Sequence, residues 1–182
     1  MDALIPAFVA ALAAGIGDRP ARLAARLGDS AGAGRTVSGM AIGHATGIAI
    51  SVAGAMWMAP MLTPNARALM LAVALVFAGA GALWGSRAPA PPRGSPVIAA
   101  AAGSFVAGDR TAFLAFGLAL NAAVPLLAGA GALAGALVLA GVAATLGNRE
   151  WERLPLTLVG RIAGGVMLPI GLIVGAGALR LT

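Results

Sequence analysis

Long apolar runs constrain this chain more than any other feature. Six are expected, at approximately 3–26, 36–58, 66–85, 97–119, 124–146 and 159–180, and Gly, Pro or Arg residues separate them. Crossing the roughly 30 Å hydrocarbon core of a bilayer takes about 20 apolar residues in a helix. A segment that faces lipid must also satisfy its backbone hydrogen bonds internally. The sequence therefore predicts an all-α membrane protein with six transmembrane helices.

The composition argues against a soluble enzyme. Only 10% of the 182 residues are charged, whereas a typical soluble domain has about 25%. The sequence contains no cysteine and one histidine, so it offers no thiolate metal site, histidine cluster or Ser/His/Asp set. We therefore expect no enzymatic activity and no bound cofactor, and we expect the lipid bilayer to be the main partner.

The net charge of +6 comes from arginines scattered between the apolar runs. This distribution indicates membrane topology rather than nucleic-acid binding, because positive residues accumulate in cytoplasmic loops. Only Arg67 and Arg180 lie on the side opposite the first, third and fifth connections. Those three connections carry Arg22, Arg26, Arg35, Arg87, Arg93, Arg149, Arg153 and Arg161. We therefore predict a multi-pass protein of the cell inner membrane with both termini periplasmic.

A charged motif occurs twice inside the apolar runs. Gly17-Asp18-Arg19 lies in the first run and Gly108-Asp109-Arg110 in the fourth, 91 residues further on (109 − 18). Three glycine pairs follow at an offset of 92: Gly39 with Gly131, Gly43 with Gly135, and Gly79 with Gly171. These matches indicate an internal repeat.

The repeat divides the chain into two halves. We predict a first three-helix repeat over 1–86, a proline-rich cytoplasmic linker over 87–96 and a second three-helix repeat over 97–182. Because three is an odd number, the second half enters the membrane from the opposite side. The sequence thus predicts two inverted three-helix repeats, the arrangement of many secondary transporters with midplane sites.

Asp18 and Asp109 are the strongest functional candidates. An ionisable side chain within a span costs at least about 2.5 kcal/mol and is by default a functional residue with a partner. Neighbouring helical residues point about 100° apart, so a pair between Asp18 and Arg19 is unfavourable. We expect either pairing between the halves or an Asp that faces the cavity with its Arg elsewhere. A carboxylate site for a cation or proton is favoured, and a structural salt bridge between the halves is the alternative.

His44 lies in the second run beside Gly39, Gly43 and Gly47. It is either a proton relay or a hydrogen-bonded packing residue. The four-residue glycine spacing lets another helix backbone approach closely. We expect that contact within the bundle, with a homo-oligomer interface as the alternative.

The motif, six spans and central linker together resemble the transmembrane protein 165 type of cation/proton antiporter family. That family carries Glu-x-Gly-Asp-(Lys/Arg)-(Thr/Ser) in the first helix of each half. Here the motif falls on Gly17, Asp18 and Arg19, and on Gly108, Asp109, Arg110 and Thr111. Gly15 and Val106 stand at the glutamate positions, and Pro20 at the first hydroxyl position. The resemblance implies exchange of Mn²⁺ or Ca²⁺ for protons, with Asp18, Asp109 and Thr111 as ligands.

We therefore expect a secondary transporter for divalent cations and protons with a midplane carboxylate site. Hard divalent cations prefer about six or more oxygen ligands, and this chain lacks both motif glutamates. Two alternatives follow. One is a non-transporting membrane scaffold with structural Asp/Arg pairs, and the other is an exporter of amino acids or other small metabolites.

Overall fold

The computed structural model describes residues 3–84, 95–107 and 109–180, which are helical with short connections. The helices are α1 (Leu4–Gly15), α2 (Arg19–Ala31), α3 (Ala33–Met58), α4 (Pro64–Trp84), α5 (Pro96–Ala107), α6 (Asp109–Asn121), α7 (Pro125–Arg153) and α8 (Leu156–Ala178), with a 3-10 turn, η1 (Ala59–Met61). No strand occurs within the described ranges, so the predicted all-α class is confirmed. Most of the predicted linker 87–96 lies outside them, although Pro96 already begins α5.

Four helices, α3, α4, α7 and α8, are long and apolar enough to cross a membrane. They coincide with the second, third, fifth and sixth predicted runs, although α7 continues to Arg153 through a kink at Gly147. The expectation of single helices over 3–26 and 97–119 was wrong. The first run is the pair α1 and α2, bent by 71°, and the fourth is the pair α5 and α6, bent by 54°. The described chain therefore has four to six candidate spans.

Proline marks where several helices start. Pro64, Pro96 and Pro125 are the first residues of α4, α5 and α7, and a proline fits there because the first helical N–H has no intrahelical partner. Before α4, the Thr63 hydroxyl accepts a hydrogen bond from the backbone N–H of Ala66 at 3.3 Å, as an N-cap residue does. Local sequence thus sets these helix starts.

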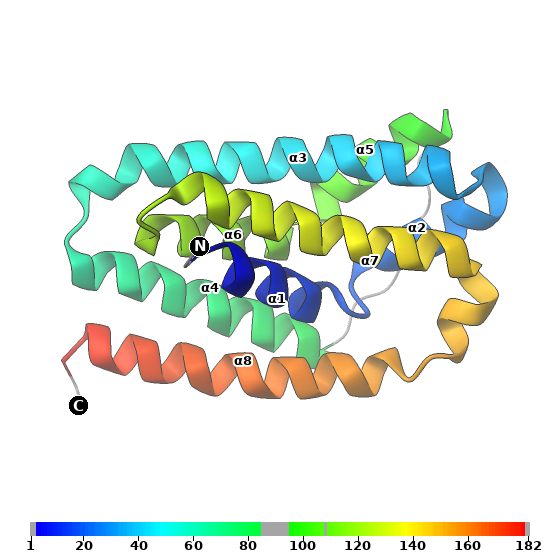
Figure 1. Cartoon of the computed structure of the whole chain (residues 1–182). Helices are drawn as coiled ribbons and strands as arrows, with labels where there is room; N and C mark the ends of the chain where they lie inside the picture. Colours follow the sequence, from blue (N-terminus) through cyan, green and yellow to red (C-terminus); the bar gives the residue numbers. More distant parts are fainter. Residues whose placement is uncertain (1–2, 85–94, 108, 181–182) are drawn as a thin grey trace.

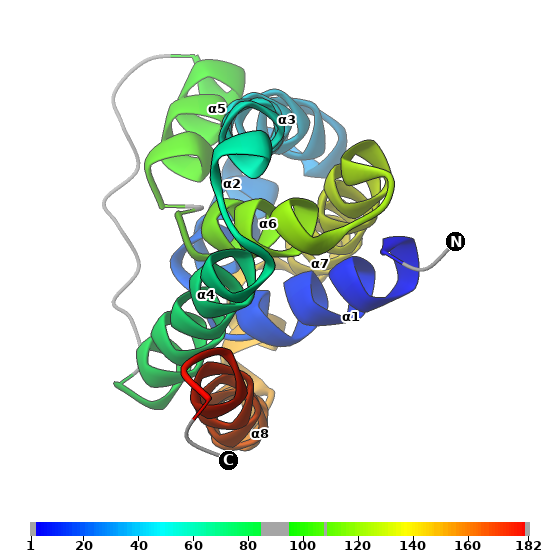
Figure 2. The same cartoon turned by 90° about the vertical axis from the view of Figure 1, so that its left-hand side faces the viewer.

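The long helices α3, α4, α7 and α8 run lengthwise through the molecule (Figure 1). Viewed from the end, α8 lies at the edge beside α4, while α5 lies outside α3 (Figure 2). The short helices α1 and α2 pack on α7, and α5 and α6 pack on α3. Each bent pair therefore contacts a long helix of the other half of the chain.

Glycines permit two of these contacts. Gly39 and Gly43 of α3 face α5, where a Cβ on Gly39 would lie 2.5 Å from the carbonyl oxygen of Val97. Gly131 and Gly135 of α7 face α1, where a Cβ on Gly135 would lie 2.6 Å from a carbonyl oxygen. Such distances leave no room for a side chain. The prediction that Gly39 and Gly43 pack helices within the bundle is confirmed.

The third glycine pair lies between α4 and α8. A Cβ on Gly79 would lie 3.0 Å from the backbone nitrogen of Leu168 in α8. A Cβ on Gly171 would lie 3.0 Å from the carbonyl oxygen of Ala72 in α4. All three pairs that the offset of 92 relates are therefore contact residues between helices of different halves.

One end of the bundle carries the α2–α3 and α7–α8 connections (Figure 1). The second half of α2 packs there against the end of α7, where Trp151 is buried in a core with Leu23 and Leu27. The Asp29 carboxylate accepts a hydrogen bond from the backbone N–H of Asn148 at 2.8 Å, directly after the kink at Gly147. The half-helix α2 is thus fastened to α7 by both apolar and polar contacts.

Candidate functional site

The first apolar run breaks at the Gly-Asp-Arg motif because its residues stop one helix and start another. Gly17 has φ +74°, a left-handed conformation that glycine adopts without steric cost. Asp18 then caps α2, its carboxylate accepting the backbone N–H of Arg19 at 2.8 Å. Pro20 occupies the first turn of α2, where its missing N–H leaves no bond unmade. The break therefore places a carboxylate at a helix N-terminus inside the bundle.

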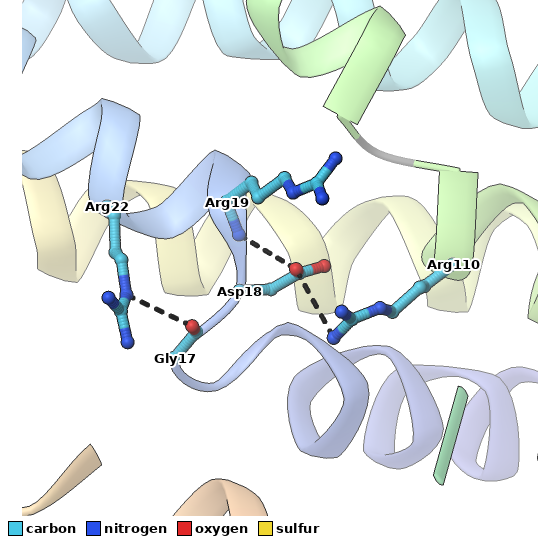
Figure 3. A network of polar contacts seen from close by, with 5 residues as sticks. All are labelled: Gly17, Asp18, Arg19, Arg22 and Arg110. Atoms are coloured by element: carbon cyan, nitrogen blue, oxygen red, sulfur yellow. Dashed lines mark hydrogen bonds and ion pairs between the residues drawn. The ribbon is translucent and has the colours of Figure 1, made fainter. Parts of the chain in front are cut away.

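Asp18 forms an ion pair with Arg110 from the other half of the chain (Figure 3). The Arg110 Nη1 lies 3.3 Å from Asp18 Oδ1, and the two side chains are 13% and 4% exposed. Arg110 stands near the start of α6, 92 residues after Asp18 (110 − 18). The prediction that the charged residues pair between halves is confirmed for these two.

The neighbouring arginines take other positions. The Arg19 side chain is exposed and runs above the Asp18 side chain in the same direction (Figure 3). Arg22 donates its Nε–H to the carbonyl oxygen of Gly17 at 3.2 Å. Because Arg22 satisfies a carbonyl that the break removes from helical bonding, it supports the bend.

A small cavity joins three of the predicted residues. Asp18 from the break, His44 from α3 and Thr111 from α6 line a space of about 10 Å³, and all three are buried. The remaining lining residues are small or apolar: Ala11, Gly15, Pro20, Ala21, Ala136, Leu139 and Ala140. A cavity needs about 10–15 Å³ to hold one water. The space is therefore at the lower limit of the volume that one water needs, and residues of both halves line it.

The metal-site prediction is tested only in part. Gly108 and the side chain of Asp109 lie outside the described residues, so the expected meeting of Asp18 and Asp109 stays a prediction. Within the described part of the chain, no group of three His, Cys, Asp or Glu residues could hold a metal ion. Of the predicted ligands, Asp18 and Thr111 line one cavity. His44, which the sequence predicted as a proton relay or a packing residue, lines the same cavity.

Gly81 of α4 is a site residue that the sequence analysis missed. A Cβ at this position would lie 2.6 Å from Arg110 Nε and 2.8 Å from its Cζ. The guanidinium of Arg110 therefore lies directly against the α4 backbone. Among many glycines in apolar runs, nothing in the sequence distinguishes this one, since its contact is formed only by the packing of α4 on α6.

A larger hollow of about 460 Å³ lies between the start of α1 and the α6–α7 connection. Ala3, directly before α1, and Pro6 of α1 line this hollow, whereas the later α1 residues Ala11 and Gly15 line the small cavity. Between the two spaces, Ala7 and Leu120 are buried in an apolar cluster. The small cavity is thus separated from the hollow by packed apolar residues.

Comparisons of the chain with known protein families, with curated proteins and with solved structures found no match.

Proposed function

We propose that this protein is a secondary transporter that exchanges a small cation for protons, with Asp18 as the carboxylate to which both bind. The observation that carries the proposal is the Asp18–Arg110 ion pair, buried where a broken apolar helix meets a small cavity of about 10 Å³. Ionisable residues placed in this way within membrane segments commonly mark an ion pathway.

The packing of the glycines supports an inverted repeat. If the two halves are equivalent, α3 corresponds to α7 and α5 corresponds to α1. The contact of Gly39 and Gly43 with α5 then corresponds to the contact of Gly131 and Gly135 with α1. In the same way, the contact of Gly79 in α4 with α8 corresponds to the contact of Gly171 in α8 with α4. Related halves that meet at a central site are the framework for alternating access in many transporters.

Charge balance gives the site its chemistry. A carboxylate in an apolar interior must be neutralised, because an isolated buried charge is strongly unfavourable. A proton, a cargo cation or the Arg110 guanidinium can each neutralise Asp18. Since these alternatives compete for one carboxylate, occupation by one ion opposes occupation by another. Competition of this kind couples the flux of a cation to the opposite flux of protons.

Mn²⁺ and Ca²⁺ are the cargoes to test first, as the family resemblance implies. The Asp18 carboxylate and the Thr111 hydroxyl are oxygen donors of the kind that hard cations prefer, and Asp109 is proposed as the third ligand. The inverted repeat also predicts a pair between Arg19 and Asp109, equivalent to that of Arg110 and Asp18. The bilayer, the cation and the proton are then the partners of the chain.

The bundle end that carries the α2–α3 and α7–α8 connections is proposed to face the cytoplasm of an inner membrane. Arg35 lies near the start of α3, and Arg149 and Arg153 lie at the end of α7. Arg67 lies near the start of α4, at the opposite end. The positive-inside tendency favours this orientation and puts both termini in the periplasm.

Flux in liposomes that contain the purified protein tests the proposal. A Mn²⁺ or Ca²⁺ gradient should drive cation uptake and raise the internal pH, and Asp18→Asn should lower both signals to near the level of protein-free liposomes. Asparagine can still cap α2, so the change removes chiefly the charge. Glu150→Gln, the same change at an exposed residue, should leave the flux unaltered. Equal flux for wild type and Asp18→Asn would refute the proposal.

Two other functions make different predictions in this assay. In a non-transporting scaffold, the buried ion pair only joins the halves, so Asp18→Asn would lower the folded yield without any flux to lose. In an exporter of amino acids or similar metabolites, Arg110 would hold a substrate carboxylate. That function would give substrate flux in the absence of Mn²⁺ and Ca²⁺, with sensitivity to Arg110→Gln.

A further inference from the structure

We infer that Arg110 acts as an internal counter-cation, which holds Asp18 between transport events and which a cargo cation must displace in order to bind. This inference rests on the proposed function and extends it to how the site controls cargo affinity. Arg110 would thus be a positioning and specificity residue of the cation site rather than a ligand.

The charge of Arg110 lies at the carboxylate that a cargo cation would use. Arg110 Nη1 lies 3.3 Å from Asp18 Oδ1, which is within the range of direct charge attraction for a poorly exposed pair. A cation that binds to Asp18 encounters this positive charge at the same oxygen. Like charges repel strongly where water is excluded, so cargo and guanidinium cannot both occupy the carboxylate at full strength.

The residue after Arg110 belongs to the same cavity. Thr111, which follows Arg110 in α6, lines the cavity with Asp18. One turn of α6 therefore provides both a hydroxyl facing the cavity and the cation that now holds Asp18. A cargo ion that uses the Thr111 hydroxyl enters beside Arg110 and has to compete with it.

Arg110 also contacts α4. A Cβ on Gly81 would lie 2.6, 2.8 and 3.0 Å from the Nε, Cζ and Nη2 atoms of Arg110. Because Gly81 has no side chain, the guanidinium can lie close to the α4 backbone while it reaches Asp18. Three parts of the fold, the α1–α2 break, α6 and α4, thus hold the counter-cation in place.

Competition predicts a specific effect on affinity. If Arg110 and cargo exclude one another, removal of the guanidinium charge lowers both the Kd and the KM for the cation. We expect a decrease of about tenfold or more, where tenfold corresponds to about 1.4 kcal/mol of pairing. The maximum rate should not rise in parallel, because the tighter complex releases its cargo more slowly.

The experiment measures binding of Mn²⁺ and of Ca²⁺ to detergent-purified protein by calorimetric titration and by the shift in Tm. Arg110→Gln should unfold at a lower temperature without metal, bind metal more tightly than wild type and gain more Tm from it. Arg110→Lys keeps a positive charge and should remain close to wild type. Arg153→Gln removes an exposed arginine and should have no effect.

Gly81→Ala provides a second test that does not depend on the folding of Arg110→Gln. Its Cβ would displace the guanidinium without removing it, so affinity should change in the same direction by a smaller factor. Gly165→Ala, on an α8 face with no neighbouring atom within 4 Å of the added Cβ, is the matched control. The inference is overturned if neither Arg110→Gln nor Gly81→Ala binds metal more tightly than wild type.

The two levels of the proposal fail in different ways. Metal binding and flux that require Asp18 but do not respond to Arg110→Gln or Gly81→Ala would refute the counter-cation and leave the transport proposal intact. Absence of Asp18-dependent binding and flux in wild type and in both variants would refute both.

Discussion

Neutralising both members of the Asp18–Arg110 pair should destabilise the protein much less than the sum of the two single substitutions. Asp18→Asn leaves a buried guanidinium, and Arg110→Gln leaves a buried carboxylate. The double variant leaves neither charge. Because the side chains come from different halves of the chain, the coupling between the two substitutions measures how strongly the pair holds the halves together.

The structure sets the scale of this coupling. At 3.3 Å, two unit charges attract one another by about 5 kcal/mol if the effective dielectric constant is about 20. Breaking a buried pair by removing one partner typically costs about 3–5 kcal/mol. We therefore expect each single substitution to lower the free energy of unfolding by about 3 kcal/mol and the coupling to be about 2–3 kcal/mol.

A double-mutant cycle measured by SDS-driven unfolding in mixed micelles tests this value. The chain offers a matched control in Glu150 and Arg153, an ion pair whose side chains are 50% and 59% exposed. Exposed pairs contribute about 0.2–1 kcal/mol, so Glu150→Gln with Arg153→Gln should show coupling in that range.

Additive effects of Asp18→Asn and Arg110→Gln would refute the reasoning. That result would mean that water or other groups screen the two charges as completely as at the surface. Coupling no larger than that of the exposed control would have the same meaning. In either case, the charge arguments for cargo competition at Asp18 would lose their basis.

Three further predictions concern packing and topology. Gly135→Ala should lower the free energy of unfolding by about 1–3 kcal/mol, because the added Cβ overpacks against α1. Gly141→Ala is the control, since no atom lies within 4 Å of its added Cβ, and equal unfolding midpoints for the two variants would contradict this prediction. Gly17→Ala should cost about 1–2 kcal/mol because of its positive φ, and an unchanged unfolding midpoint would show that the break has relaxed. The chain has no native cysteine, so single cysteines can report its orientation. Ser30→Cys should react with an impermeant thiol reagent only from the cytoplasm, and Thr63→Cys only from the periplasm. Labelling of both from one side would contradict the proposed orientation.

The positions of the long helices could be predicted from the sequence because length and apolarity are local properties. The predicted runs 36–58, 66–85, 124–146 and 159–180 correspond closely to α3, α4, α7 and α8. Apolarity does not report where the backbone bends. The same reasoning therefore predicted one helix where the structure has the pair α1 and α2, and one where it has the pair α5 and α6. The first break did carry a local signal that was missed: Gly17 can end a helix, Asp18 can cap the next, and Pro20 fits its first turn.

The sequence predicted that a charge pair between the halves could form at the site, but not which residues would surround it. The geometry of adjacent helical residues favoured pairing between halves over pairing of Asp18 with Arg19, and the structure confirms a pair with Arg110. The position of His44 was visible in the sequence, but its place beside Asp18 and Thr111 was not. That cavity forms because α3, α6 and α7 pack around the α1–α2 break.

By itself, the sequence determined a largely apolar helical chain for a membrane, with two charged motifs within its apolar runs. These properties follow from composition and spacing along the backbone. Only the tertiary structure decided that Arg110 reaches Asp18 across 92 residues and lies against Gly81. The physical reason is that such contacts depend on how closely glycine and alanine faces let separate helices approach, and that distance is a property of packed surfaces rather than of any one segment.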